Sequence, residues 1–282
     1  MDKVVGIGKF GCMVAEEFTT YPEYRIYQIG PANPGKADLE VPLQASIEDY
    51  ESTANSDEIA IYLRSIKKKD GVLVILSGGD PINGIALRVL EQIKDSKVTV
   101  LYVAPDRQIM SDIQKRDDKI VFGILQEYAR SGVIAEVLLL GRPAVENLVG
   151  DVPISEYEKS TNHFIAYIVA MVNYFKNTES VFESRAEKAN ISRIATYGVA
   201  SLEPSADINY LFPLSDWQDA HFYYGIPEGE LSKNASLMRE IKDQARRFSK
   251  EGINTGFSVH STTFENIMVL CTAGTKDVQE AQ

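Results

Sequence analysis

The sequence has few of the residues that build disulfide-bonded or metal-binding proteins. Its 282 residues include only two cysteines, Cys12 and Cys271, which are too few for a disulfide framework. The three histidines, His163, His221 and His260, lack the spacing of metal ligands, so we predict no metal site. We predict that both cysteines are reduced thiols. Thiols stay reduced in the cytosol, so the sequence predicts a cytoplasmic protein.

Long apolar runs and an excess of basic charge are also missing. The longest apolar run, Phe164 to Val172, is too short to cross a bilayer, and no signal-peptide pattern precedes the first apolar run. The 29 basic residues are outnumbered by 40 acidic ones, which gives a formal net charge of −11. This charge argues against broad binding to nucleic acid or to anionic membranes. We therefore predict no membrane segment and no nucleic-acid partner.

Two glycine-rich stretches each follow a short apolar run. Gly6 to Cys12 follows Lys3 to Val5, and Ser77 to Gly84 follows Val72 to Leu76. A buried strand that ends in glycines and leads into a helix presents backbone N–H groups that can bind phosphate. Two such loops at the carboxyl ends of strands in one sheet can face a single nucleotide. Each loop alone is equally well explained as a tight turn.

The periodicity of the chain predicts its fold class. Apolar runs alternate with helical spacing over 3–7, 13–18, 25–29, 47–68, 72–76, 85–93, 98–103, 120–128 and 133–140. This alternation is typical of a parallel sheet with helices on both faces.

A long stretch over 155–175 is apolar on nearly every side in its middle, which predicts a buried helix. After it, 194–199, 221–225 and 267–272 have the pattern of strands, and 237–248 that of an amphipathic helix. We predict an α/β protein with three parts: a Rossmann-like nucleotide-binding domain over 1–153, a central helix over 154–177, and a smaller α/β domain over 178–282.

In order and spacing, these parts resemble the tubulin superfamily, most closely the FtsZ-like proteins. The run from Gly8 to Cys12 stands where tubulins carry Gly-Gln-Cys-Gly-Asn, and the run from Gly78 to Gly84 where the family carries Gly-Gly-Gly-Thr-Gly-Thr-Gly. The stretch 266–274 is similar to the family's second domain. The resemblance implies a tubulin/FtsZ-like fold and a subunit that assembles with itself, head to tail, into cytoskeletal filaments. It also implies GTP or GDP as the ligand, with Mg²⁺ as a candidate companion ion.

The resemblance further implies a set of site residues. The nucleotide contacts would be Gly8, Lys9, Gly11, Cys12, Gly78, Gly79, Asn83, Gly84, Lys119, Arg142, Tyr157 and Thr161, with Asn162 and His163 as alternatives to Thr161 near the base. In the family, acidic residues after the central helix position the attacking water in the next subunit's site. The family pattern Asn-x-Asp-x-x-x-Asp is absent here, and Glu183 and Glu187 are the nearest substitutes. Both lie in a charged stretch that is equally well explained as a solvated face.

The second glycine loop departs from the family pattern. Asp80 and Ile82 replace glycines, and Pro81 has no backbone N–H to offer to phosphate. Three functions therefore stay open: a filament subunit with weak or absent GTP hydrolysis at the subunit junction, a non-hydrolysing structural or assembly protein such as a virus- or plasmid-borne homologue, and a Rossmann-type dinucleotide-dependent enzyme. The third rests on the glycine spacing of Gly6, Gly8 and Gly11, and no acid for a ribose follows at the second strand.

Overall fold

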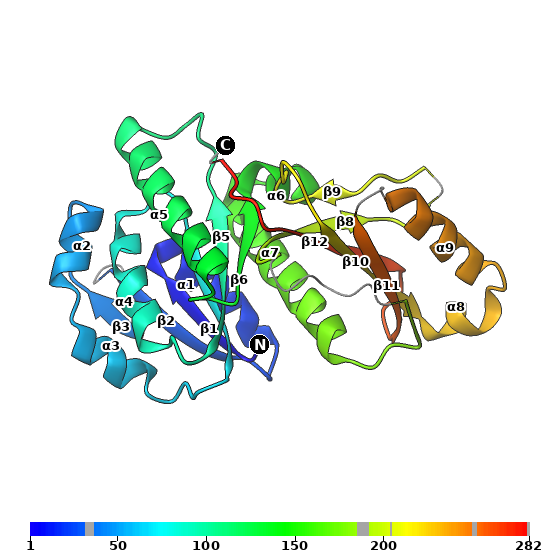
Figure 1. Cartoon of the computed structure of the whole chain (residues 1–282), viewed down its shortest axis with the longest axis horizontal. Coiled ribbons are helices and arrows are strands. Elements are labelled where there is room, and N and C mark those ends of the chain that lie inside the picture. Colours follow the sequence, from blue (N-terminus) through cyan, green and yellow to red (C-terminus); the bar gives the residue numbers. More distant parts are fainter. Residues whose placement is uncertain (32–36, 185–191, 204, 250–252, 281–282) are drawn as a thin grey trace. The chain divides into compact units, whose positions relative to one another are not determined.

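The computed structural model describes residues 1–31, 37–184, 192–203, 205–249 and 253–280 (Figure 1). The chain divides into two compact units. Unit 1 comprises Met1–Tyr167 and Val278–Gln282, and unit 2 comprises Ile168–Asp277. Each unit is an α/β structure, so the predicted α/β fold class is confirmed.

Unit 1 is built on a parallel sheet with the strand order β3–β2–β1–β4–β5–β6. Its strands are β1 (Lys3–Ile7), β2 (Arg25–Pro31), β3 (Leu39–Val41), β4 (Gly71–Ser77), β5 (Lys97–Ala104) and β6 (Glu136–Gly141). Strands β1 and β4 are neighbours in the middle of this order. The sheet continues from β1 through β2 to β3 on one side, and from β4 through β5 to β6 on the other. A crevice forms at such a switch point, beside the carboxyl ends of the strands.

The helices of unit 1 are α1 (Gly8–Glu17), α2 (Ile47–Thr53), α3 (Ser56–Leu63), α4 (Ala86–Gln92), α5 (Asp112–Ser131) and α6 (Arg142–Val149), with short 3₁₀ turns η1 (Phe18–Thr20) and η2 (Pro81–Ile85). The predicted helix over 47–68 is two helices, because Ser46 caps α2 and Asn55 caps α3. Helix α5 begins at Asp112, earlier than the predicted 120, because Ser111 and Gln114 form a capping box.

Helix α7 (Ile154–Asn177) contains the long apolar stretch. Its residues Ile165, Ile168, Val169 and Val172 are at most 2% exposed, which agrees with the prediction of a buried helix. The first part of α7 belongs to unit 1 and the rest to unit 2. Among the described residues, no helix is both long and apolar enough to cross a membrane.

Unit 2 is a mixed sheet with the strand order β8–β12–β10–β11–β7. Its strands are β7 (Phe182–Ser184), β8 (Ile194–Ala200), β10 (Asp219–Pro227), β11 (Asn254–Thr262) and β12 (Met268–Thr275), and the short β9 (Asn209–Tyr210) pairs with β8. Strands β10 and β11 are parallel, and the other pairings are antiparallel. The helices are α8 (Glu228–Lys233) and α9 (Leu237–Phe248). Leu237, Ile241 and Phe248 of α9 are buried in one core cluster with Phe222 and Tyr224 of β10.

Candidate functional site

Strand β1 runs directly into α1 through Gly8, whose φ of 76° favours glycine. A Cβ atom on Gly6 would lie 2.3 Å from the carbonyl oxygen of Gly11, and one on Gly11 would lie 2.4 Å from that of Ile75. These glycines therefore let α1 approach β1 and β4 closely. The N-cap residue of α1 is Ile7, whose apolar side chain makes no capping hydrogen bond to the first N–H groups of the helix.

A cavity of about 690 Å³ lies beside this helix end, within unit 1. Its described lining residues come from α1, from β2 and the segment after it, and from the first turns of α7: Gly8, Lys9, Cys12, Met13, Glu16, Glu17, Gln28, Gly30, Pro31, Ala37, Ser155, Glu158, Lys159 and Asn162. Three of the predicted nucleotide contacts, Gly8, Lys9 and Cys12, are among them. The volume suits a small organic ligand.

The cavity contains two lysines that no described acid pairs with. Lys9 on α1 and Lys159 on α7 are exposed and form no ion pair within the described chain. Glu17, by contrast, contacts Nδ1 of His163 at 3.0 Å. Burial raises the pKa of the Cys12 thiol to about 12, so this side chain is a neutral packing group rather than a nucleophile.

Asn162 is the most informative side chain of the cavity. It is 3% exposed, and its Oδ1 atom accepts no hydrogen bond from any described group. A buried acceptor without a donor costs roughly 1–3 kcal/mol, so this atom is suited to a ligand that supplies a donor. The neighbouring Thr161, predicted as a base contact, instead donates its hydroxyl to the carbonyl oxygen of Tyr157 at 2.8 Å.

The predicted contacts Arg142 and Tyr157 are held by each other and by Glu146. Nε of Arg142 donates to Oε1 of Glu146 at 3.0 Å, and the Tyr157 hydroxyl donates to the same oxygen. The guanidinium of Arg142 also lies 5.6 Å from the ring centroid of Tyr157 and 5.7 Å from that of Phe10. Neither Arg142 nor Tyr157 is among the cavity-lining residues of the described chain.

Several hydrogen-bond donors of the second glycine loop are already bonded to protein acceptors. Gly78 N–H donates to the Val103 carbonyl at 3.0 Å, and Ile82 N–H donates to Oδ1 of Asp80 at 3.2 Å. Asn83 donates its backbone N–H to the Asp80 carbonyl and its side-chain amide to the Ser77 carbonyl. These internal bonds leave the loop fewer donors for a bound anion.

The same loop is also packed against protein on the side of its glycine α-carbons. A Cβ on Gly84 would meet the Ile47 carbonyl oxygen at 2.1 Å, and one on Gly78 would meet the Tyr102 hydroxyl at 2.3 Å. Gly79 has a φ of 72°, and a Cβ on it would meet the terminal methyl group of Met110 at 2.5 Å. The structure does not bring Gly78, Gly79, Asn83 and Gly84 into the described lining of the cavity.

The side chain of Asp80, in the second glycine loop, lies close to Gly8 in the first. Its Oδ2 atom lies 3.0 Å from the position that a Cβ on Gly8 would occupy, so a carboxylate already lies at the start of α1. Burial raises the pKa of Asp80, and the hydrogen bond from Ile82 N–H opposes that rise in part. No described cation pairs with Asp80. The negative charge that the sequence places in this loop is thus beside the helix end that a phosphate would approach.

The remaining predicted residues lie elsewhere. Lys119 is exposed on α5, outside the described lining of the cavity. Gly11 packs on β4, as described above. Glu183 lies in β7 of unit 2, and Glu187 lies outside the described residues. In the part of the chain that the structure describes, no group of three or more His, Cys, Asp or Glu residues is placed to hold a metal ion.

The cavity also contains functional candidates that the sequence analysis left out. These are Gln28, Ser155, Glu158 and Lys159, of which Gln28 donates its amide to the Cys12 carbonyl at 2.8 Å. The helical spacing within 155–162 puts Ser155, Glu158, Lys159 and Asn162 on one side of α7. This spacing is the sequence pattern from which these cavity residues could have been predicted together. The predicted pair of Tyr157 and Thr161 lies on another side of the same helix.

No protein-family model and no curated protein sequence matches this chain. Solved structures do match. A GTPγS-form protofilament of TubZ from Bacillus thuringiensis serovar israelensis has a TM-score of 0.74 at 13% identity, covering 98% of this chain and 86% of TubZ. An FtsZ dimer from M. jannaschii has a TM-score of 0.71 at 14% identity, covering 97% of this chain and 87% of FtsZ.

A third match is the GTPγS-bound protofilament of CetZ2 from Haloferax volcanii, with a TM-score of 0.65 at 15% identity. It covers 100% of this chain and 95% of CetZ2. At these identities the likeness establishes the fold. The tubulin/FtsZ-like fold implied by the glycine loops and the central helix is therefore confirmed.

Proposed function

We propose that this chain is a filament subunit of the tubulin/FtsZ type, which binds a guanine nucleotide in the unit 1 cavity and hydrolyses it weakly or not at all. The observation that carries the proposal is the cavity itself, which lies beside the start of α1 and contains the unpaired amide oxygen of Asn162. Structures of the same fold are a GTPγS-form TubZ protofilament, an FtsZ dimer and a two-stranded TubZ filament.

The base end of the cavity suits guanine. Guanine presents an exocyclic amino group and an adjacent ring N–H, and both are donors. Asn162 Oδ1 is a buried acceptor that lacks a donor, so a guanine edge would relieve its desolvation penalty. Lys9 and the start of α1 would then receive the phosphates, because cations and helix N-termini both favour anions.

Exposed apolar side chains support self-assembly. In unit 1, Leu43 is 68% exposed, Ile109 is 84% exposed and Ile113 is 65% exposed. Leu43 follows β3 and Ile109 follows β5, so both lie in loops at the carboxyl edge of the parallel sheet. In unit 2, Val181 is 62% and Phe182 is 39% exposed. A contact between these two unlike surfaces on successive copies is heterologous and does not close, so it generates a filament.

Nucleotide content tests the proposal. Freshly purified protein, denatured in acid, should release GDP or GTP, and Asn162→Leu should weaken guanine-nucleotide binding at least tenfold, since a hydrogen bond to a buried acceptor is lost. Thr161→Val is the matched control, because the Thr161 hydroxyl is already bonded to the Tyr157 carbonyl. Release of a nicotinamide dinucleotide would instead indicate the dinucleotide-dependent enzyme, and equal affinities of the two variants would remove Asn162 from the site.

Asp80 should weaken binding of the phosphates. Asp80→Asn keeps the side-chain shape and the acceptor for Ile82 N–H but removes a charge near the start of α1. We expect about 10- to 100-fold tighter binding of GTP. Each tenfold gain needs only about 1.4 kcal/mol, and the repulsion between a carboxylate and a nearby phosphate in a partly buried site exceeds that.

Titration of pH separates this charge effect from a shape effect. Because burial raises the pKa of Asp80, the carboxyl takes up its proton at a higher pH than usual and then stops repelling phosphate. Affinity of the wild-type chain, relative to that of Asp80→Asn, should therefore rise as pH falls toward and below this raised pKa. A constant affinity ratio over the whole range, measured by calorimetry, would show that the charge of Asp80 does not act on the nucleotide.

A second candidate function is a structural filament subunit that has lost both nucleotide hydrolysis and the bound nucleotide. It is favoured by the second glycine loop, whose donors Gly78, Ile82 and Asn83 are satisfied internally and whose Asp80 already lies beside α1. Protein that polymerises but releases no nucleotide on acid treatment would establish this alternative.

A further inference from the structure

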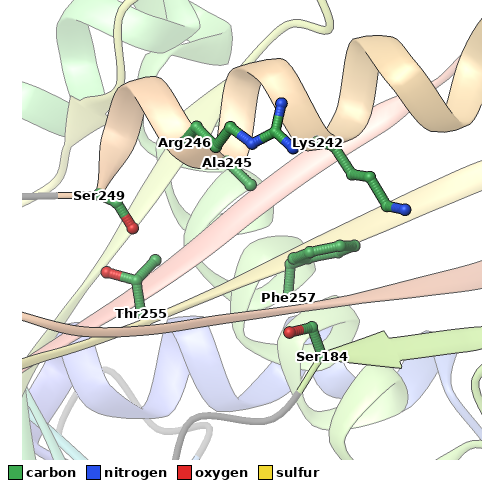
Figure 2. A pocket seen from close by; sticks show the side chains of 7 residues that line it. All are labelled: Ser184, Lys242, Ala245, Arg246, Ser249, Thr255 and Phe257. Atoms are coloured by element: carbon green, nitrogen blue, oxygen red, sulfur yellow. The ribbon is translucent and has the colours of Figure 1, made fainter.

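A second pocket lies wholly within unit 2, between α9 and the strands β11 and β7 (Figure 2). Its volume is about 250 Å³, and the described residues that line it are Ser184, Lys242, Ala245, Arg246, Ser249, Thr255 and Phe257. Figure 2 shows Ser249 and Thr255 facing each other at one end, with Lys242 above Phe257 at the other. None of these residues takes part in the nucleotide site proposed above.

The pocket is locally cationic on an acidic chain. Lys242 and Arg246 are four residues apart on α9, so they lie on the same side of the helix. Lys242 forms no ion pair within the described chain, and its Nζ atom instead lies 5.7 Å from the ring centroid of Phe182. Arg246 pairs with Asp243 at 3.0 Å, but both side chains are more than 60% exposed, so this pair is weak and exchangeable.

The α9 dipole explains only part of this arrangement. An arginine in the last turn complements the negative end of a helix, which accounts for Arg246. It does not account for Lys242, which lies further from the helix end, or for the hydroxyls of Ser184, Ser249 and Thr255 around the same hollow.

The lining offers hydrogen-bond donors to an anion. The ammonium and guanidinium groups donate, and so can the hydroxyls of Ser184 and Ser249. The Thr255 hydroxyl donates to the Ile253 carbonyl oxygen only at 3.5 Å, a long bond that an anion could replace. None of the described lining residues is acidic. A phosphate monoester carries about −1.5 to −2 charges at neutral pH and three strong acceptor oxygens, whereas a carboxylate has one charge and two oxygens. The ring of Phe257 and the methyl group of Ala245, which are 9% and 7% exposed, form an apolar wall for a short carbon body.

We propose that this pocket binds a phosphate monoester, with Lys242 and Arg246 pairing its charge, the Ser249 and Thr255 hydroxyls bonding its oxygens, and Phe257 packing on the carbon that carries it. A water molecule occupies about 30 Å³ in the liquid, so a pocket of about 250 Å³ holds more than a phosphate group alone. The ligand is therefore either a small soluble monoester or a phosphorylated side chain of a partner protein.

Two probes distinguish these sources: glycerol phosphate, and a short blocked peptide with a central phosphoserine. Binding is measured by calorimetry and by the amide shifts of Ser249 and Thr255 in the full chain. Lys242→Ala and Arg246→Ala should each weaken binding about tenfold or more, since each removes a charge-assisted hydrogen bond. The same peptide with aspartate in place of phosphoserine should bind at least tenfold more weakly than the phosphopeptide.

Arg239→Ala is the matched control, because it removes one exposed positive charge from the same helix outside the described lining of the pocket. It should leave probe affinity within about twofold of the wild type, since only general attraction changes. Tighter binding of the peptide identifies a phosphorylated partner, and equal binding of the two probes identifies a small monoester. Equal losses in the Lys242, Arg246 and Arg239 variants, or no binding of either probe by folded protein, would overturn the proposal.

Discussion

Replacing Ile109 with glutamate should abolish polymer formation at protein concentrations where the wild-type chain assembles. Ile109 is 84% exposed at the carboxyl edge of the unit 1 sheet, where we propose that the next copy docks. Burying an unpaired carboxylate in that contact costs several kcal/mol, so the critical concentration should rise by at least about 100-fold. Light scattering across a concentration series measures it. Ile61→Glu is the matched control, because Ile61 is 64% exposed on α3, away from that edge.

A mixing experiment tests whether the contact is head to tail. Val181→Glu should block the other partner surface, since Val181 is 62% exposed in unit 2. Each variant alone should stay monomeric, but each keeps one intact and complementary surface. An equimolar mixture should therefore form dimers that grow no further, as seen by analytical ultracentrifugation. Filaments in the mixture, or normal assembly of either variant alone, would contradict the proposed surfaces.

Replacing Glu183 with glutamine should slow any GTP hydrolysis by roughly 10²–10⁴-fold, while nucleotide binding and assembly stay intact. A water that attacks the terminal phosphate must lose a proton, and a carboxylate is the usual acceptor. Glu183 lies on β7 next to the exposed Phe182. A head-to-tail contact through β7 would therefore place Glu183 near the nucleotide cavity of the neighbouring subunit. The proposed site is then complete only at a subunit junction.

Phosphate release per subunit, measured at several protein concentrations, tests this role. Glu179→Gln is the control, an exposed acid just before β7, and it should hydrolyse at the wild-type rate. Glu187→Gln is the second variant, since the sequence analysis proposed both glutamates. If the rate per subunit stays flat while polymer forms, or if Glu183→Gln matches the wild type, a shared catalytic site involving Glu183 is excluded.

The strongly patterned elements of this fold could be predicted from the sequence. The apolar run Val72 to Leu76 became the buried centre of β4, and 237–248 became α9 with the same bounds. Strand β11 was missed, because its sequence from Asn254 to Thr262 mixes Gly, Ser, His and Thr with only two apolar residues. Its pairing with β10 over the full length is a long-range effect that local periodicity does not contain.

The candidate site could be predicted in part, and the limit again lies in packing. The first glycine loop places Gly8 and Lys9 at the cavity, as the strand–helix pattern indicates. The second loop does not, because the residues that cover it, such as Ile47 and Tyr102, come from distant segments. The sequence left Thr161, Asn162 and His163 open as the base contact. In the structure Asn162 lines the cavity, while the Thr161 hydroxyl donates to the Tyr157 carbonyl oxygen. Successive helix residues differ by about 100° around the axis, and only the surrounding tertiary structure decides which of them faces the cavity.

Electron microscopy of the purified chain with GTP, above and below a critical concentration, tests the central claim most directly. We expect single-stranded or bundled filaments of one repeating subunit, which appear only above that concentration and disappear in the Ile109→Glu variant. A chain that stays monomeric, or that stops at closed dimers, at every concentration with and without GTP would contradict the proposal that this fold serves as a filament subunit here.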